Sequence, residues 1–560
     1  MRNKANSYIS RIPQIKLPRS IFPVNFSRKQ TQKASYLVPI FYQEVLPGDT
    51  WQINMRAFVR LATQLTSPLD NLWVKTYFFF DPHRLQWENF VKQHGERKNP
   101  NDTIDYMTPT ITYPNGIPYK SLADYLGRTR CGIKNTKMTA LGHRMYNRVV
   151  NAYFRSERLQ DSLYENDTDA NDVPEKYSLF KIGKDRDYFT NCLPDLQLGE
   201  QVMLPLGTTA PVAGTGLALG LNDGNSNSGM ISHRGAASGG FVTLTGDTNA
   251  YGKKINSGTY NAPGLNEFKA IGVTTDPTKS GLYADLSSAV SASISAMRLV
   301  IDTQEILERD NRNGTRYTEQ LEGRYGCINP DLLMYRPQYL GGTSTPLFTT
   351  PVVQTSGTGS TGQNTPQGNI AGFGTASEKG EVIRASFGEF GAIMGLAVIK
   401  AIPQYQQGMG KCWNRMERYD YYYPEFNGLS DQAVENGEIF YQGEDVKDKT
   451  TNENVDKLTF GYIPRYDDYR TFNNEICGEL RSEYPQTLDV WHYAEKFEEL
   501  PKLNGEFIKD KTDEIVKRTV AVQNDDDETA EQCICDFQFS GSVTRVLPSH
   551  GIPRTGGSIL

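Results

Sequence analysis

The sequence predicts a mainly β fold of stacked sheets, and three kinds of segment carry that prediction. Across residues 51–61 every second side chain is apolar and most of those between are polar, as in a strand with one buried and one wet face. Residues 72–80 and 391–402 are apolar on both faces, which is typical of strands covered on both sides. A last alternating run at 533–539 places strands near both ends of the chain. We therefore expect one domain interrupted by long insertions.

That expectation divides the chain into three parts. Residues 1–35 are basic and interrupted by prolines, so we expect an extended arm without a core of its own. Residues 36–207 and 282–560 form the single core, with helices and loops inserted between its strands. Residues 208–281 are rich in glycine and poor in charge, which indicates a surface insertion.

The basic arm contains no Asp or Glu, and none occurs before Glu44. A cationic segment of this kind neutralises phosphates, which makes its basic residues candidates for contact with nucleic acid. The alternatives are a solvated tail or an arm that reaches over a neighbouring subunit. The candidate residues are Arg2, Lys4, Arg11, Lys16, Arg19, Arg28, Lys29 and Lys33.

Between the strands, periodicity predicts short helices and turns. Pro47-Gly48 supplies the turn between the first two strands, since Pro presets φ and Gly accepts positive φ. Apolar residues at helical spacing predict helices at 85–94, 119–126 and 143–159, and a longer one whose stripe runs from Leu286 to Leu307 and ends at Asn313-Gly314. Residues 341–380 are rich in Gly, Ser and Thr, so we expect a second long loop there.

Motifs for catalysis or cofactor binding are weak throughout. GTGSTG at 357–362 matches a dinucleotide fingerprint, but the sequence that follows cannot start a helix. Cys533 and Cys535 share one face of a strand, which favours core packing over a zinc site. The acidic run at 525–528 is typical of a solvated loop. We expect no enzymatic activity, no cofactor and no metal site.

The sequence shows none of the usual signals for export or membrane insertion. The N-terminal apolar residues are interrupted by charges and prolines, unlike a signal peptide. Seven scattered cysteines favour a reducing compartment over a disulfide framework. The longest apolar run is too short to span a bilayer, so we expect no membrane insertion.

The Tyr-rich segment at 413–426 leaves three function classes open. Its aromatic side chains could stack on sugars or bases, or bury against another subunit. Nearby carboxylates keep a jelly-roll carbohydrate-binding or carbohydrate-active protein as the main alternative to a structural protein. A phage fibre or adhesin is the third class.

Six segments resemble the major capsid protein of the Microviridae, small icosahedral bacteriophages with circular single-stranded DNA, and the long insertion resembles the gokushovirus branch. The segments are LVPIFYQEVLPGDTWQI, FFFDPHRLQWENF, ERDNRNGTRYTE, YRPQYLGG, YQQGMGKCWNRMERYDYYYPEF and FGYIPRYDDYRTFNNEICGELR. The resemblance implies an eight-stranded antiparallel jelly roll of viral capsid type, with long helix- and loop-containing insertions. It also implies sixty copies in an icosahedral shell around the genome, assembled in the bacterial cytoplasm and located in the virion.

The resemblance further implies partners and candidate sites. The partners are an internal scaffolding protein, the single-stranded DNA genome, small DNA-binding and pilot proteins, and a host surface receptor. The basic arm would contact DNA or the inner wall. Residues 208–281 would form a protrusion at the three-fold axes, with Asn222, Asp223, His233, Arg234 and Tyr251 exposed on it. Apart from the resemblance, the density of Arg, Glu and Tyr at 309–325 suits a polar interface between subunits as well as a binding site. With the Tyr-rich segment, the residues expected at subunit contacts are Arg309, Arg316, Tyr317, Arg418, Tyr419, Tyr421, Tyr422 and Tyr423.

Overall fold

The computed structural model describes residues 18–127, 130–200, 202–203, 294–328, 334–353, 370–520 and 531–549, with the backbone of four short strands between 212 and 284. The chain divides into two compact units. One comprises Met1–Leu196 and Asp310–Leu560, and the other comprises Gln197–Arg309.

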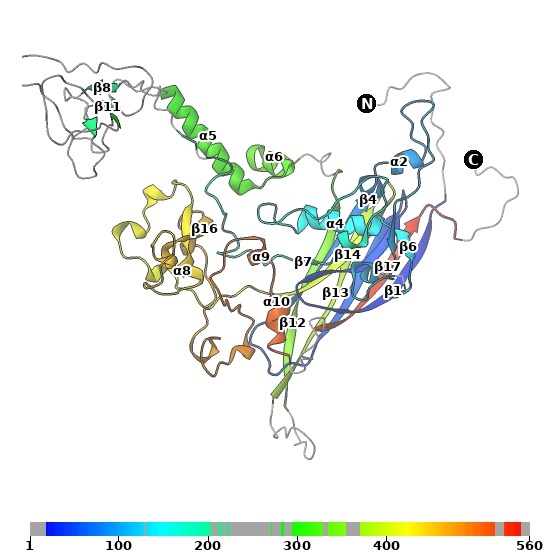
Figure 1. The fold of residues 1–560 in the computed structure, drawn as a ribbon. Helices are drawn as coiled ribbons and strands as arrows, with labels where there is room; N and C mark the ends of the chain where they lie inside the picture. The colour runs from blue at the N-terminus through cyan, green and yellow to red at the C-terminus, as the bar shows by residue number, and fades with distance from the viewer. Residues whose placement is uncertain are drawn as a thin grey trace, which may run out of the picture. The chain divides into compact units, whose positions relative to one another are not determined.

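The first unit is built around a curled antiparallel sheet (Figure 1), which has nine strands among the described residues. Their order across the sheet is β1-β17-β3-β13-β12-β4-β14-β2-β7. Their bounds are β1 Ser20–Gln32, β2 Tyr36–Val45, β3 Thr50–Leu61, β4 Leu72–Pro82, β7 Phe180–Lys181, β12 Gln338–Val353, β13 Ile370–Ser386, β14 Gly391–Ala401 and β17 Cys533–Arg545.

Eight of these strands are long, and their order is that of a jelly roll. Numbered along the chain, the long strands form one half in the order 1-8-3-6 and another in the order 5-4-7-2, joined where β13 pairs with β12. Strands from the two ends of the chain lie side by side, as β1 and β17 do, which is the arrangement of interlocked Greek keys. The expected eight-stranded antiparallel jelly roll with insertions is confirmed.

Alternation of side chains explains why these segments pair as they do. In β3 every second side chain from Trp51 to Leu61 is buried, whereas Gln52, Arg56 and Arg60 between them are exposed. One large core lies on the inner side of the sheet and includes Phe41, Ile53, Phe78 and Phe539 among its members. Burying this apolar area stabilises the sheet by roughly 25 cal/mol per Å².

A second core lies on the opposite side of β4 and β14, beneath helices. Phe78 and Phe80 face the first core, while Phe79 faces the second. All residues of β14 are buried because both of its faces are covered. Gly395 on β14 fits where a side chain would not, since an added Cβ would lie 2.5 Å from the Phe78 ring.

The helices that cover this second core follow β4 in the chain. α3 Leu122–Leu126 and α4 Leu141–Tyr153 contribute to this core, and the antiparallel strands β5 Thr110–Tyr113 and β6 Thr136–Thr139 flank α3 in the chain. The short helices α1 His83–Gln86 and α2 Phe90–Gln93 directly follow β4. Met145, Tyr146, Val149 and Val150 of α4 pack into the core, as their helical spacing predicts.

A third core joins residues 188–192 to short elements between 434 and 508, and includes Phe189, Val434, Phe460 and Phe507. The remaining α-helices and short strands of this unit are α6 Tyr317–Tyr325, β15 Gln432–Glu435, α8 Asn436–Ile439, β16 Thr459–Ile463, α9 Gly505–Ile508 and α10 Thr512–Lys517. The 3-10 helices are η2 Pro174–Lys176, η4 Lys411–Trp413, η5 Arg418–Asp420, η6 Pro424–Phe426, η7 Val455–Lys457, η8 Asp467–Tyr469, η9 Gly478–Leu480 and η10 Asp489–Trp491.

The second unit contains two short strand pairs and most of a long helix. β8 Val212–Gly214 pairs with β11 Leu282–Ala284, and β9 Leu221–Asn222 pairs with β10 Ala270–Ile271. The helix α5 Ile294–Asn313 ends before Gly314, whose φ of +92° suits glycine, as predicted. Its apolar stripe is exposed at Ile294, Met297 and Ile301. The predicted start of that stripe lies outside the described residues.

Three expectations need correction. Residues 20–32 of the supposed arm form strand β1, paired along their whole length with β17. The supposed loop at 341–380 contains most of β12 and the first part of β13, so the jelly roll draws strands from before residue 380. The single helix expected at 85–94 is two short helices, α1 and α2, with the buried Trp87 between them. None of the helices among the described residues is long and apolar enough to cross a membrane.

Candidate nucleic-acid interface

The outward face of the half-sheet β1-β17-β3-β13 is a polar, solvent-exposed surface. Alternate side chains on these strands point away from the core, and antiparallel register sets them in rows across four strands. Two rows are Asn25–Ser540–Asn54–Glu381 and Ser27–Gln538–Arg56–Lys379. The next two are Lys29–Asp536–Phe58–Ser377 and Thr31–Ile534–Arg60–Thr375. We call the surface formed by these four rows the outer sheet face.

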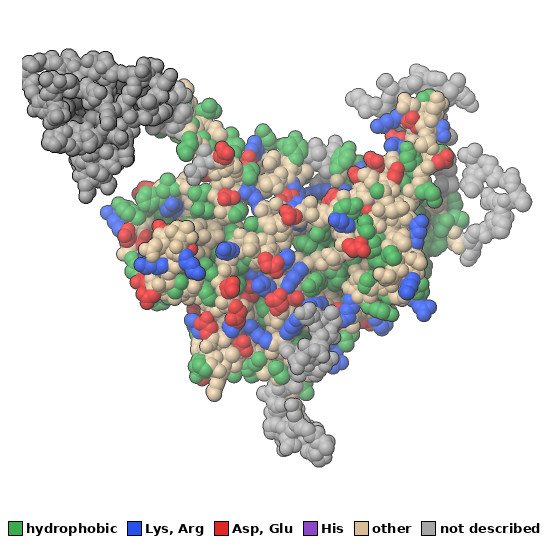
Figure 2. Space-filling model, in the orientation of Figure 1, with side chains coloured by type: hydrophobic (Ala, Val, Ile, Leu, Met, Phe, Trp, Pro, Cys, Tyr) green, Lys and Arg blue, Asp and Glu red, His purple; other side chains and the backbone are tan. Residues whose placement is uncertain are grey.

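Positive charge predominates on and beside the outer sheet face. The basic side chains on the face are Lys29, Arg56, Arg60 and Lys379, and Arg384 lies beside it on β13. The acidic side chains on the face are Asp536 and Glu381. Asp536 lies 4.0 Å from Lys29, and Glu381 lies 3.9 Å from Arg384. On the side of the molecule drawn in Figure 2, basic and acidic side chains are interspersed. An excess of cations on one sheet face is suited to polyanions.

A depression of about 420 Å³ lies at the first two rows of this face. Its lining includes the polar side chains of Asn25, Asn54 and Gln538 and the cations Arg56 and Lys379. Amide groups both donate and accept hydrogen bonds, and the cations supply charge. The depression is therefore equipped to hold a polar, negatively charged group.

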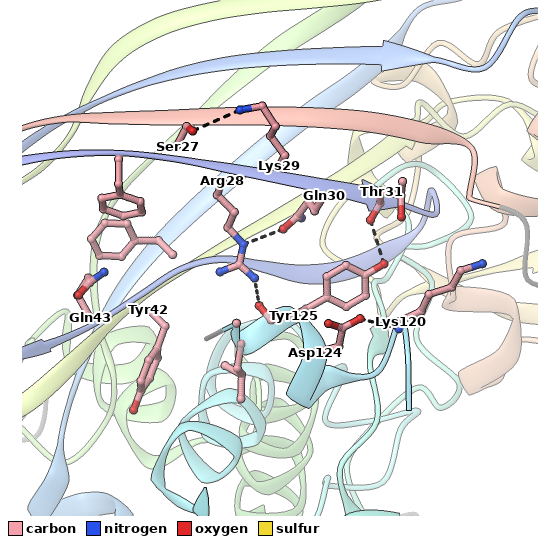
Figure 3. Close-up of a pocket in the computed structure, with 14 residues that line it drawn as sticks. Ser27, Arg28, Lys29, Gln30, Thr31, Tyr42, Gln43, Lys120, Asp124 and Tyr125 are labelled. Carbon is pink, nitrogen blue, oxygen red and sulfur yellow. Dashed lines mark hydrogen bonds between the residues drawn. The ribbon is translucent and has the colours of Figure 1, made fainter. Parts of the chain in front are cut away.

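Of the predicted DNA-contacting residues, the structure exposes some at the surface and ties others to neighbouring parts of the chain. Arg19 and Lys29 are exposed, and the Lys29 side chain points away from the core. Arg28 points to the other side of β1, where it donates hydrogen bonds to Gln30 and to the carbonyl oxygen of Tyr125 at the end of α3 (Figure 3). Arg28 thus ties the edge strand to α3.

The remaining predicted DNA-contacting residues are Lys33 and four residues near the N-terminus. The Lys33 Nζ lies 3.8 Å from Asp513 and 5.6 Å from the centre of the Tyr36 ring, so it holds structure within the chain. Arg2, Lys4, Arg11 and Lys16 lie outside the described residues.

A second pocket, of about 570 Å³, lies along the edge of β1 opposite β2 and α3 (Figure 3). Arg28, Lys29, Lys120 and Asp124 are among its lining residues. The Lys120 Nζ lies 3.9 Å from Glu531, so both signs of charge meet near this pocket.

The predicted interface residues at 418–423 form one aromatic group on the surface. The Tyr419 ring lies 6.0 Å from that of Tyr423, and the Arg418 guanidinium lies 5.6 Å from the Tyr419 ring centre. Tyr421 and Tyr422 are about half exposed, and Tyr422 contacts Tyr466 at 4.8 Å between ring centres. Exposed aromatic area of this kind is typical of protein interfaces.

The other predicted interface residues behave differently from one another. Arg316 is tied within the chain, because it pairs with Glu157 at 2.6 Å and Glu319 at 2.7 Å. Arg309 forms an exposed helix pair with Glu305, and Tyr317 is exposed. Of the predicted protrusion residues, Asn222 lies in β9, and Asp223, His233, Arg234 and Tyr251 lie outside the described residues.

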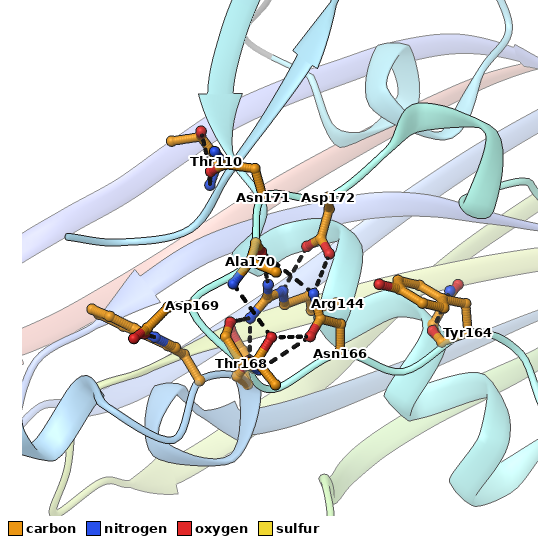
Figure 4. Close-up of polar contacts among 12 residues, drawn as sticks. Thr110, Arg144, Tyr164, Asn166, Thr168, Asp169, Ala170, Asn171 and Asp172 are labelled. Atoms are coloured by element: carbon orange, nitrogen blue, oxygen red, sulfur yellow. Dashed lines mark hydrogen bonds and ion pairs between the residues drawn. The ribbon is translucent and has the colours of Figure 1, made fainter. Parts of the chain in front are cut away.

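Sequence reasoning missed a buried polar network around Arg144 (Figure 4). Arg144 is 2% exposed, pairs with Asp172 at 2.6 Å, and donates to the carbonyl oxygens of Thr168 and Ala170 at 3.0 and 2.9 Å. Buried guanidinium groups need this number of partners to offset desolvation. The network pins the loop at 164–172 to α4 and is structural.

Burial of the cysteines agrees with the core-packing prediction. Cys533 and Cys535 are buried in the first core, and burial raises the pKa of the Cys535 thiol to about 12. All seven cysteines are free. Among the described residues no three His, Cys, Asp or Glu side chains are grouped as metal ligands would be.

Comparison with known proteins identifies the family. A family model described as capsid protein (F protein) matches residues 10–555. Capsid protein VP1 of Bdellovibrio phage phiMH2K is 37% identical, covering 99% of each chain. The VP1 proteins of Chlamydia phage 1 and Spiroplasma virus 4 are 33% and 30% identical, covering at least 95% of each chain. Each of these relatives is named as a capsid protein, which is a structural role. The chain belongs to the capsid protein (F protein) family of the Microviridae, in its gokushovirus branch.

Proposed function

We propose that sixty copies of this major capsid protein assemble into an icosahedral shell that encloses circular single-stranded DNA. The match of a capsid family over residues 10–555, on a jelly-roll core, is the observation that carries the proposal. The jelly roll supplies a rigid block, and its long connections supply surfaces for neighbouring subunits. Assembly takes place in the bacterial cytoplasm with an internal scaffolding protein, and small DNA-binding and pilot proteins join the particle.

Three surfaces are assigned roles in that shell. The basic residues of 1–17, together with Arg19 and Lys29, contact DNA or the inner wall, supported by their charge and the exposure of Arg19 and Lys29. The aromatic group at 418–423 contacts a neighbouring subunit, supported by its half-exposed Tyr side chains. The insertion 208–281 protrudes at the three-fold axes and meets the host receptor, supported by its composition.

Electron microscopy of the chain co-expressed with its scaffolding protein tests the proposal. Closed shells of uniform size are expected, and only monomers or fibres would contradict it. Nuclease-protected DNA recovered from infected-cell particles tests the arm. Replacing Lys4, Arg11, Lys16 and Arg19 with Gln should lower packaged DNA and particle yield, and unchanged values would remove the arm from this role.

A further inference from the structure

We infer that the outer sheet face is a stacking platform for single-stranded DNA, on which the Phe58 ring carries a base and the flanking arginines hold phosphates. This inference rests on the proposed enclosure of DNA and deepens it by naming the contact. Its experiment scores DNA binding and shell formation separately.

The position of Phe58 is the first step. Phe58 lies on the polar side of β3, is 47% exposed, and breaks the otherwise polar series Gln52, Asn54, Arg56 and Arg60. A large apolar ring in the centre of a wet sheet face adds nothing to the core. An exposed aromatic ring on a four-stranded sheet is a surface on which unpaired bases stack.

Charge placement is the second step. Arg56 and Arg60 stand two residues on either side of Phe58, so their Cα atoms are each about 7 Å from that of Phe58. Lys379 is in register with Arg56 on the neighbouring strand, and Arg56 and Lys379 line the 420 Å³ depression. The ring is therefore flanked by cations along the strand, which suits a backbone that carries one phosphate for each base.

The remaining surface fits the same occupant. Asn25, Asn54 and Gln538 line the depression and offer donors and acceptors to a base edge or sugar. Phe348 of β12 is in register with Thr375 at the end of the row that contains Arg60, and it is also exposed. A second exposed ring on the same face gives the strand another surface for stacking.

A protein partner is the competing occupant, because exposed aromatic and aliphatic groups also occur at protein interfaces. The excess of cations favours the polyanion. A protein would need matching acidic residues, whereas any stretch of single-stranded DNA supplies the charge.

The test measures binding of the purified full-length chain to a fluorescein-labelled 20-mer of deoxythymidine by anisotropy, over a series of salt concentrations. Phe58→Ala is expected to raise Kd about tenfold, because one stacked base is lost, with an unchanged slope of log K against log salt. Phe58→Trp should restore binding. Phe472→Ala, the same change at a ring that is 93% exposed outside the sheet, is the matched control and should leave Kd unchanged.

The charged residues are tested by their salt dependence. Arg56→Gln combined with Arg60→Gln should flatten the salt slope by about 1.4, since each phosphate contact on a single strand contributes about 0.7. Lys447→Gln combined with Lys449→Gln removes the same charge from an exposed loop and should flatten it by less. Thermal unfolding of each variant confirms that the fold is intact.

The outcomes separate this inference from the proposed function. Equal Kd values for Phe58→Ala and Phe472→Ala overturn the stacking platform, whatever the state of the shells. Loss of shells in Phe58→Ala with unchanged DNA affinity assigns the face to a protein and overturns it as well. Failure of the wild-type chain to form shells, with DNA binding that depends on Phe58, overturns the proposed shell and leaves the platform standing.

Discussion

His143 is a buried residue whose neutral form is required by its surroundings. It is 1% exposed on α4, and its Nε2 lies 3.0 Å from the Tyr113 hydroxyl. Burial lowers the pKa of His143 to about 4, although the nearby Asp172 carboxylate acts in the opposite direction. The unfolded chain therefore binds a proton below pH 6.5 that the folded chain does not accept until about pH 4.

The free energy of unfolding should consequently fall as the pH drops from 6.5 towards 4, by up to about 1.4 kcal/mol per pH unit from this group. His143→Gln, which keeps a hydrogen-bonding group for Tyr113, should flatten this part of the profile. Urea unfolding of the unassembled chain between pH 7 and pH 4 measures it. His94→Gln, at an exposed position, is the control, and equal slopes for wild type and His143→Gln would refute the assignment.

At the scale of elements, β1 shows how a strand is formed by its partner. Its sequence is basic and polar, yet Phe22, Val24 and Phe26 alternate inward and pack against the first core. Pairing with β17 supplies backbone hydrogen bonds along the whole strand, and Arg28 secures the open edge to α3. The outward residues of β1 remain available for binding.

The insertion is an element that the core should not need. Gly214 and Leu282 are partners in the β8–β11 pair, so the two sides of the insertion lie next to each other. Replacing residues 215–281 with a short Gly/Ser bridge should therefore leave soluble protein whose melting temperature is within a few degrees of wild type. Particles that carry the deletion should assemble but lose adsorption to host cells. Insoluble protein would show that the insertion is required for folding.

At the scale of the whole molecule, assembly depends on surfaces that the isolated chain leaves exposed. Tyr421→Ala combined with Tyr422→Ala should reduce the yield of shells much more than it lowers the melting temperature of the unassembled chain, because these rings are half exposed. The matched control is Tyr119→Ala combined with Tyr335→Ala, two exposed tyrosines elsewhere. A lower melting temperature with normal shell yield would place the pair in the fold instead of the interface.

Local pattern alone determined much of this protein. Alternation in 51–61 and 533–539 and the doubly apolar runs at 72–80 and 391–402 identified β3, β17, β4 and β14, since side-chain burial repeats every two residues in a strand. The family followed from six short segments. The search for catalytic motifs also needed only short stretches of sequence, because such motifs depend on a fixed spacing between residues.

Only the tertiary structure decided which partner each segment meets. β1 and β12 are polar or glycine-rich, and they become strands because β17, β13 and β4 offer them hydrogen-bonding edges. The rows that bring Lys29, Arg56 and Lys379 onto one face with Phe58 join residues more than 300 positions apart. Long-range register is set by packing of the two sheet halves, which no window of sequence contains.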